Sequence, residues 1–294
     1  MGEGGEPYRL YAMNLLDGLA VVTMALNLPG PVACARLRDL GARVTKVEPP
    51  DGDPLAGYCP SWYARLHAGM AVRRLDLKAD AGRREMEALL AGADLFVSAQ
   101  RPSALARLGL DAASLAARHP RLCVLAITGH GPPDEEKAGH DLTYLAGHGL
   151  VAPPRLPPTL FADMAGAERA VSTALALLLA RDRDGAGRAL AVPLAEAAAF
   201  LAQPLAEGLT RPGATLGGGL AGYNLYEARD GWIAVAALEP HFARRLAQAL
   251  GLESLARETL AARFAAESAG HWEAWARSLD LPIVAIRPIP PPSP

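Results

Sequence analysis

Cysteine, lysine and aromatic residues are scarce in this sequence, and the cysteines bear most directly on the class of protein. The three cysteines among 294 residues, Cys34, Cys59 and Cys123, form no CxxC pair, so neither a disulfide framework nor a metal site is expected. Their odd number is typical of reduced thiols in a cytoplasmic protein. With no basic block and a net charge of −2, the chain is not expected to bind nucleic acid.

A membrane-spanning run is absent as well. The longer apolar runs, such as Ala170–Ala180, fall well below the roughly 20 residues that cross a bilayer. Residues Met1–Leu10 lack the apolar core of a signal peptide, and Pro288–Pro294 is mostly proline, which predicts a disordered tail. We therefore expect a cytoplasmic protein without a membrane partner.

What the sequence does contain is a regular alternation of short apolar runs with segments of helical spacing. Six runs are predicted strands: Leu19–Met24, Val44–Val47, Leu75–Leu77, Leu95–Ser98, Leu122–Ile127 and Leu190–Pro193. Strands that alternate with helices predict an α/β fold with a doubly wound, largely parallel sheet that is covered on both faces.

The pattern changes near residue 211. Arg211–Gly222 is rich in glycine and proline and is interpreted as a linker or mobile loop. A β-hairpin that turns at Asp230-Gly231 is predicted next, followed by helices near Pro240–Leu250 and His271–Ser278. The predicted parts are a large α/β domain over residues 1–211, a small α+β domain over 212–287 and the tail over 288–294.

The first strand-to-helix turn lacks the features of a dinucleotide-binding loop. It reads Asn27-Leu28-Pro29-Gly30-Pro31, with one glycine between two prolines. Proline has no backbone N–H to hold a pyrophosphate. Neither a P-loop nor a GxSxG motif occurs in the chain. A nicotinamide site of the usual kind is therefore not expected.

Several ordered motifs together resemble the family III CoA-transferases of the CaiB/BaiF type, which include the α-methylacyl-CoA racemases. They are Leu16–Val22, Asp39–Pro50, Ala93–Val97 and Leu108–Asp111, and the similarity runs from about Leu16 to about Leu252. The resemblance implies an interlocked homodimer that acts on an acyl-CoA thioester. CoA would then be part of the substrate, with no separate cofactor and no metal.

The resemblance also implies three catalytic residues. Asp163, in the segment Phe161–Gly166, is a nucleophile in the transferases of this family and an acid/base group in the racemases. His140 lies where racemases carry a catalytic histidine, and Glu239 where they carry a glutamate that supports it. These two residues favour an epimerase of 2-methylacyl-CoA thioesters that moves the α-proton through an enolate. The alternatives are CoA transfer through an aspartyl-CoA thioester at Asp163, and a degenerate family member that binds CoA without catalysis.

The racemase chemistry needs two acid/base groups on opposite sides of a planar enolate. A histidine side chain serves as base or acid around neutral pH, whereas an aspartate must be tuned by its surroundings. Backbone N–H groups at the start of the helix after Asp163 are expected to face the enolate oxygen. The simpler interpretations are that Asp163 caps this helix, that His140 is an ordinary loop histidine and that Glu239 only begins a helix.

The remaining predicted contacts are with CoA. The resemblance implies that Lys46 and Arg101, at the carboxyl ends of predicted strands on the ligand-binding edge, contact CoA. Lys137, just before the His140 motif, is a further candidate for the CoA phosphates. Each of these charges is otherwise a solvated surface group. The glycine loop Gly217, Gly218 and Gly219 is expected to close over the thioester, the alternative being an unstructured linker.

The sequence departs from the family pattern at two places. Residues 67–74 lack the asparagine and lysine that relatives carry there, which puts part of the nucleotide pocket in doubt. Relatives continue beyond the motif at Leu281–Val284 with a segment that returns to the large domain, so we expect either that the proline tail substitutes for this segment or that the dimer is looser.

Overall fold

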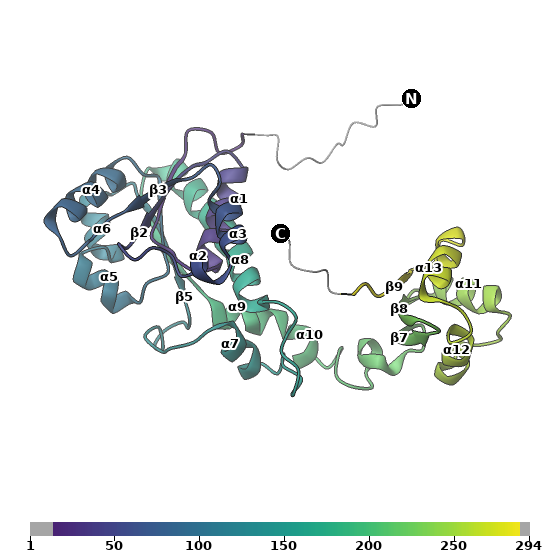
Figure 1. The fold of residues 1–294 in the computed structure, drawn as a ribbon. Helices are drawn as coiled ribbons and strands as arrows, with labels where there is room; N and C mark the ends of the chain where they lie inside the picture. Colours follow the sequence, from purple (N-terminus) through teal and green to yellow (C-terminus); the bar gives the residue numbers. More distant parts are fainter. Residues whose placement is uncertain (1–13, 289–294) are drawn as a thin grey trace, which may run out of the picture. The chain divides into compact units, whose positions relative to one another are not determined.

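A computed structural model describes residues 14–288 of the chain (Figure 1). The N-terminal segment Met1–Leu10 and the proline tail from residue 289 on lie outside the described residues. The chain forms two compact units, of which the first ends at Ala202 and the second begins at Gln203. This division falls a few residues before the boundary predicted at 212.

The first unit is built on a six-stranded sheet. Its strands are β1 (Ala20–Thr23), β2 (Arg43–Glu48), β3 (Ala71–Arg74), β4 (Leu95–Ser98), β5 (Cys123–Thr128) and β6 (Ala189–Pro193). They pair in the order β3-β2-β1-β4-β5-β6, and every pair is parallel. This order defines a doubly wound sheet, as the sequence predicted.

Helices cover both faces of this sheet. They are α1 (Pro29–Asp39), α2 (Leu55–Tyr58), α3 (Pro60–His67), α4 (Asp80–Ala91), α5 (Pro102–Leu108), α6 (Ala112–Arg118), α7 (Asp141–Gly147), α8 (Phe161–Asp184) and α9 (Leu194–Leu201). Figure 1 shows α4, α5 and α6 on one side and α1, α3 and α8 on the other. Neighbouring strand residues supply opposite cores, because successive side chains point to opposite faces: Val21 packs with α1 and α8, and Val22 with α4.

Small residues allow the long helix α8 to pack closely. Ala162, Ala167, Ala170 and Ala174 are all fully buried. A side chain at Gly166 would overlap Leu194 at the start of α9. The alanine and glycine on this face therefore hold the N-terminal turn of α8 close to the sheet and to α9.

The strand predicted at Leu75–Leu77 is wrong. The edge strand is β3, at Ala71–Arg74, and Leu75 only continues the pairing through its N–H bond to Glu48 O at 2.9 Å. All four residues of β3 are exposed, so no alternation of apolar and polar residues marks the strand in the sequence.

The second unit contains a small antiparallel sheet, β7 (Tyr223–Ala228), β8 (Gly231–Ala236) and β9 (Ile283–Ala285). Its helices are α10 (Gln203–Ala206), α11 (Pro240–Leu250), α12 (Arg257–Phe264) and α13 (Ala269–Ser278), with a π-helical turn η1 at Thr215–Gly219. The hairpin pairs Ala228 with Gly231, so its turn is Arg229-Asp230, one residue before the predicted pair. The α+β class of this unit agrees with the sequence, although α12 and β9 were not predicted.

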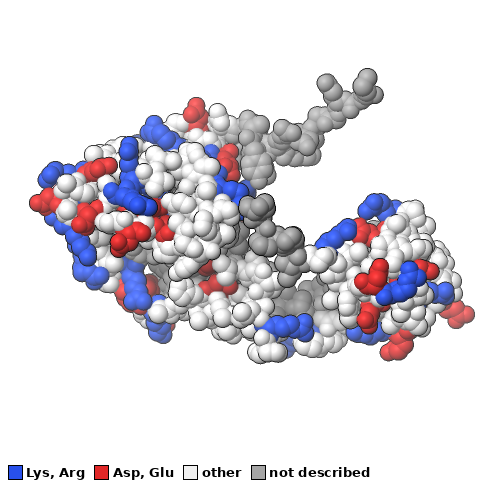
Figure 2. All heavy atoms as spheres, viewed as in Figure 1, with Lys and Arg blue, Asp and Glu red and all other residues white. Residues whose placement is uncertain are grey.

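The distribution of charged side chains on the surface and the free state of the cysteines agree with what the composition predicts. Acidic and basic side chains are interspersed on the face shown in Figure 2. All three cysteines are free, and burial raises the pKa of Cys34 to about 11. Within residues 14–288, no helix is both long and apolar enough to cross a bilayer.

Candidate active site

A cavity of about 400 Å³ opens at the carboxyl ends of β1, β4 and β5. Its lining comes from the loops after these strands and from the first turns of α7 and α8: Leu26, Asn27, Pro29, Ala99, Gln100, Arg101, Ile127, Thr128, Gly129, Glu135, Lys137, Ala138, Gly139, His140, Tyr144, Asp163 and Leu194. The strand order reverses between β1 and β4, and doubly wound sheets bind their ligands at this switch point. The cavity therefore occupies the position where the fold provides a ligand site.

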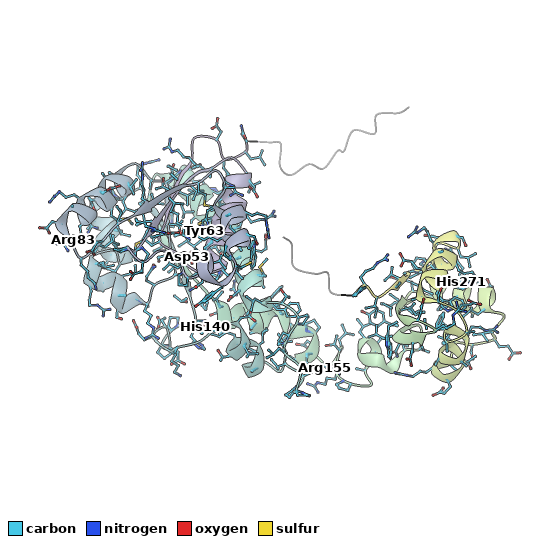
Figure 3. All side chains as sticks on the ribbon, in the orientation of Figure 1. Asp53, Tyr63, Arg83, His140, Arg155 and His271 are labelled. Carbon is cyan, nitrogen blue, oxygen red and sulfur yellow. The ribbon has the colours of Figure 1, made fainter. Side chains whose placement is uncertain are left out.

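His140 and Asp163 both line this cavity, although 22 residues separate them in the chain. His140 is the N-cap residue of α7, and its N–H donates to the Thr143 hydroxyl at 3.0 Å. Asp163 is the third residue of α8, whose N-cap is Leu160, so the capping interpretation of Asp163 is wrong. The structure thus brings together the two residues that the sequence proposed as acid and base (Figure 3 labels His140).

Asp141 holds and tunes Asp163. Its side chain is 4% exposed, and its Oδ1 accepts a hydrogen bond from the Asp163 N–H at 3.0 Å. Burial first, and the negative charge of Asp141 second, raise the pKa of Asp163 from 3.8 to about 7. Asp141 is the first residue of α7, directly after the N-cap residue His140. The one available signal was an aspartate placed directly after the proposed base.

Tyr144 is a further cavity residue that sequence reasoning did not single out. Its side chain is 3% exposed, and Gly129 and Gly139 make room for its ring. A Cβ at Gly129 would lie 2.5 Å from the phenol oxygen, and one at Gly139 would overlap the ring. The Thr128 hydroxyl, also in the lining, is buried and has no hydrogen-bond partner among residues 14–288.

Basic side chains lie on the same cavity. Arg101 is exposed at the start of α5, and its guanidinium has no partner within the described part of the chain. Lys137 is also exposed and pairs with Asp134 at 2.8 Å. Both side chains have the charge and the exposure that an anionic ligand requires.

Lys46 lies outside this lining, in a fully buried ionic cluster. Its ammonium contacts Asp53 and lies 3.4 Å from Glu48 and 2.8 Å from His67 Nε2. Burial and the Lys46 charge lower the pKa of His67. Asp53 in turn accepts the N–H of Asn27 at 3.0 Å, so the cluster supports the loop after β1 that lines the cavity (Figure 3 labels Asp53).

The other proposed site residues belong to the second unit. Residues 217–219 are ordered within η1, where side chains at Gly217 and Gly219 would overlap the carbonyl groups of Arg211 and Gly213. The interpretation as an unstructured linker is therefore wrong. Glu239 is exposed at the N-cap of α11 and makes no side-chain capping bond.

Side chains that could bind a metal ion do not cluster in the part of the chain that the structure describes. No cluster of three or more histidine, cysteine, aspartate or glutamate side chains with the geometry to hold an ion occurs in residues 14–288.

A doubly wound sheet with acid/base groups and cations around a cavity at its switch point defines an α/β protein suited to an anionic substrate. The sequence model of CoA-transferase family III matches residues 16–284, and the chain belongs to this family. The family contains both racemases and CoA-transferases, and both occur among the relatives of this chain.

The curated relatives cover both activities at similar identity. Human alpha-methylacyl-CoA racemase is 32% identical over 259 residues, which cover 81% of this chain and 65% of the relative. The cinnamoyl-CoA:phenyllactate CoA-transferase of Clostridium sporogenes is 31% identical over 209 residues, which cover 64% and 50% of the two chains. The chain thus matches between half and two thirds of the length of these two relatives.

A solved structure of the same family has the same fold. The CAIB/BAIF family protein from Brucella suis superposes with a TM-score of 0.78 at 26% identity, over 93% of this chain and 84% of that one. The predicted α/β fold and the family resemblance are therefore both confirmed.

Proposed function

We propose that the protein is an epimerase of 2-methylacyl-CoA thioesters. The observation that carries the proposal is the shared cavity of His140 and Asp163, in which burial and Asp141 raise the pKa of Asp163 to about 7. A carboxyl group with this pKa both accepts and donates a proton near neutral pH, as a general acid/base must. A carboxylate acting as a nucleophile reacts only when ionised, so a pKa of about 7 leaves part of Asp163 in the unreactive form at neutral pH.

The proposed reaction moves one proton off and another onto the same carbon. One of the pair, His140 or Asp163, removes the α-proton, and the electron pair of the C–H bond forms a double bond to the thioester carbon. The carbonyl electron pair moves to oxygen and gives the enolate. The other group then donates its proton to the opposite face, so the two residues exchange roles with the direction of reaction.

The cations of the cavity explain how CoA would be held. Arg101 and Lys137 face the cavity and are exposed, which suits binding of the CoA phosphates. Lys46 supports the site through Asp53 and Asn27, and a phosphate would have to compete with its buried acidic partners. In the interlocked homodimer that the family resemblance implies, Glu239 and the loop 217–219 would complete the site from the partner subunit.

The test is incubation with 2-methylbutanoyl-CoA in heavy water, without any carboxylic acid acceptor. Epimerisation requires deuterium uptake at the α-carbon, and Asp163→Ala and His140→Ala are expected to reduce this uptake at least 10²-fold. The Asp80→Asn variant, which alters an exposed carboxylate on α4, is the matched control and should exchange at the wild-type rate. A wild-type protein that binds the thioester without α-exchange would remove the proposal.

CoA transfer is the second candidate, because relatives with this activity match the chain as well as the racemases do. In this reaction the Asp163 carboxylate attacks the thioester carbonyl and forms a mixed anhydride as CoA thiolate leaves. The thiolate then attacks the aspartyl carbonyl, which gives an aspartyl-CoA thioester and releases the first carboxylic acid. Mass spectrometry after hydroxylamine treatment would detect this intermediate at Asp163. A degenerate CoA-binding protein would show neither this modification nor exchange.

A further inference from the structure

Neighbouring residues fix the position of the Tyr144 ring at the cavity. It is the fourth residue of α7, which begins directly after the N-cap residue His140, and both side chains line the cavity. Its ring fills the space that Gly129 and Gly139 leave open, and only 3% of its surface is exposed. The edge of the His130 ring packs against it at a centroid distance of 5.3 Å.

The phenol of Tyr144 has no hydrogen-bond partner among the described residues. Two other tyrosines with a bonded hydroxyl are Tyr63, which donates to Glu48 Oε1, and Tyr226, which donates to Ala221 O, both at 2.7 Å. The Tyr144 hydroxyl is not one of the buried polar atoms that lack a partner among residues 14–288, so its oxygen is open to the cavity that the ring lines. An open hydroxyl on the cavity that Asp163 also lines is available to donate a hydrogen bond to a molecule bound there.

The start of α8 offers fewer free donors than the sequence suggested. The Asp163 N–H is already used by Asp141 Oδ1 at 3.0 Å, so it is not available to an oxygen in the cavity. The enolate of the proposed reaction still needs a donor that faces its oxygen. Tyr144 supplies a neutral donor on the same cavity, beside both carboxylates.

We propose that Tyr144 is the oxyanion donor of this site, its hydroxyl bonding the thioester carbonyl oxygen of the bound acyl-CoA. This assignment rests on the proposed function. As the α-proton leaves and the carbonyl electron pair moves to oxygen, the hydrogen bond strengthens and the proton stays on the phenol. Reprotonation at carbon returns the pair to the carbonyl, so Tyr144 begins and ends the cycle unchanged.

The surroundings keep this phenol protonated. Burial, followed by the negative charges of Asp163 and Asp141, raises the pKa of Tyr144 above its usual value of 10. A donor must carry its proton throughout the pH range of the reaction, and these neighbours ensure that it does. The same neighbours repel a phenolate, which excludes Tyr144 as a second base near neutral pH.

The first test compares the hydroxyls of two tyrosines that are equally buried as whole residues. Tyr144→Phe is expected to lower the α-exchange rate about 10²-fold, the usual cost of losing one oxyanion donor, without lowering Tm. Tyr226→Phe removes a bonded hydroxyl from another side chain that is 3% exposed, in the core of the second unit. This control should lower Tm and leave exchange per folded molecule unchanged. Exchange by Tyr144→Phe within twofold of the wild type would overturn the proposal.

The second test does not require turnover. The infrared band of 2-methylbutanoyl-CoA labelled with ¹³C at the thioester carbonyl should shift to lower frequency on binding, and Tyr144→Phe should abolish the shift. If the shift persists in Tyr144→Phe and disappears in Thr128→Val, the donor is Thr128 and the proposal fails. A band that depends on Tyr144 in a protein without α-exchange would support the donor and refute the epimerase. A thioester that does not bind would refute both.

Discussion

Asp163 shows how the chemistry of a single residue depends on its neighbours. The aspartate itself carries an ordinary carboxyl group, and its burial and its contact with Asp141 come from elements that meet only in the folded chain. Asp141 serves twice, because one carboxylate both fixes the Asp163 backbone and disfavours the Asp163 anion. Each effect can be removed by substitution.

Asp141→Asn is expected to lower the pKa of Asp163, because it removes a negative charge and keeps an oxygen that accepts the N–H. Burial, the larger cause, remains, so the pKa should stay above 3.8. In the direction in which Asp163 removes the proton, the rise of the exchange rate with pH should shift to lower pH. The measurement is the pH profile of exchange for each epimer, with Asp80→Asn as control. An unshifted profile would contradict the role of the Asp141 charge.

Asp163→Asn is expected to abolish exchange and to stabilise the protein. Since the pKa of Asp163 is raised from 3.8 to about 7 on folding, the folded state binds more protons than the unfolded state between these values. The stability contributed by this group is therefore full below pH 3.8 and is lost as the pH rises through 7. A neutral asparagine escapes that loss. Thermal unfolding should show a gain on the order of 1–3 kcal/mol at pH 8 that shrinks at pH 5.

A carboxylate whose pKa is lowered in the folded protein, instead of raised, provides the control for this stability measurement. The Arg188 side chain lowers the pKa of Asp184, an exposed residue at the end of α8. Asp184→Asn should therefore leave Tm unchanged or slightly lower at pH 8. A parallel gain in both variants would show that the effect is unrelated to the Asp163 pKa.

At the scale of the elements, two cations of the parallel sheet and its loops differ in exposure, since one is buried and the other is exposed. Lys46, on β2, is enclosed with Asp53 and supports the loop that follows β1. Arg101, after β4, is exposed and has no partner among residues 14–288. Lys46 lies within β2 and Arg101 follows β4, and the structure gives the two cations different surroundings. Their substitutions should therefore affect different properties.

Lys46→Met is expected to destabilise the first unit by about 3–5 kcal/mol, because it leaves buried Asp53 and Glu48 without their cation. Arg101→Met is expected to leave stability within about 0.5 kcal/mol of the wild type and to weaken CoA binding about tenfold. Denaturant unfolding and calorimetric titration with CoA measure the two effects. A stable Lys46→Met protein that has lost CoA binding would make Lys46 a ligand contact instead.

At the scale of the whole molecule, the two units each carry part of the proposed machinery. His140 and Asp163 belong to the first unit, whereas Glu239 and the glycine loop belong to the second. The family resemblance implies that an interlocked homodimer combines the first unit of one chain with the second unit of the other. That implication can be tested by mixing chains with complementary defects.

Co-expressed Asp163→Ala and Glu239→Ala chains are expected to recover exchange that neither homodimer has. In the mixed dimer, the intact Asp163 of one chain would meet the intact Glu239 of its partner, which restores one site in two. Separately tagged chains, purified through both tags, provide the sample, and light scattering gives its mass. No recovery in a verified mixed dimer would place Glu239 in the same subunit as His140, or outside the site.

The sequence by itself determined the fold class, because the alternation of apolar runs and helical segments can be recognised in the order of the amino acids alone. Strand β4 has the predicted bounds, and β5 begins and ends one residue after its prediction. The exposed strand β3 escaped detection because an edge strand without a buried face has no such pattern.

Only the tertiary structure decided which of the proposed residues meet and in what state. It joined His140 with Asp163, enclosed Lys46, ordered the glycine loop and revealed Asp141 and Tyr144 as cavity residues. Burial and charge proximity depend on contacts between segments far apart in the chain, and these set the pKa of Asp163 and leave the Tyr144 phenol free to donate. Motifs carry the identity of side chains, whereas desolvation and Coulomb interactions arise only once the chain has folded.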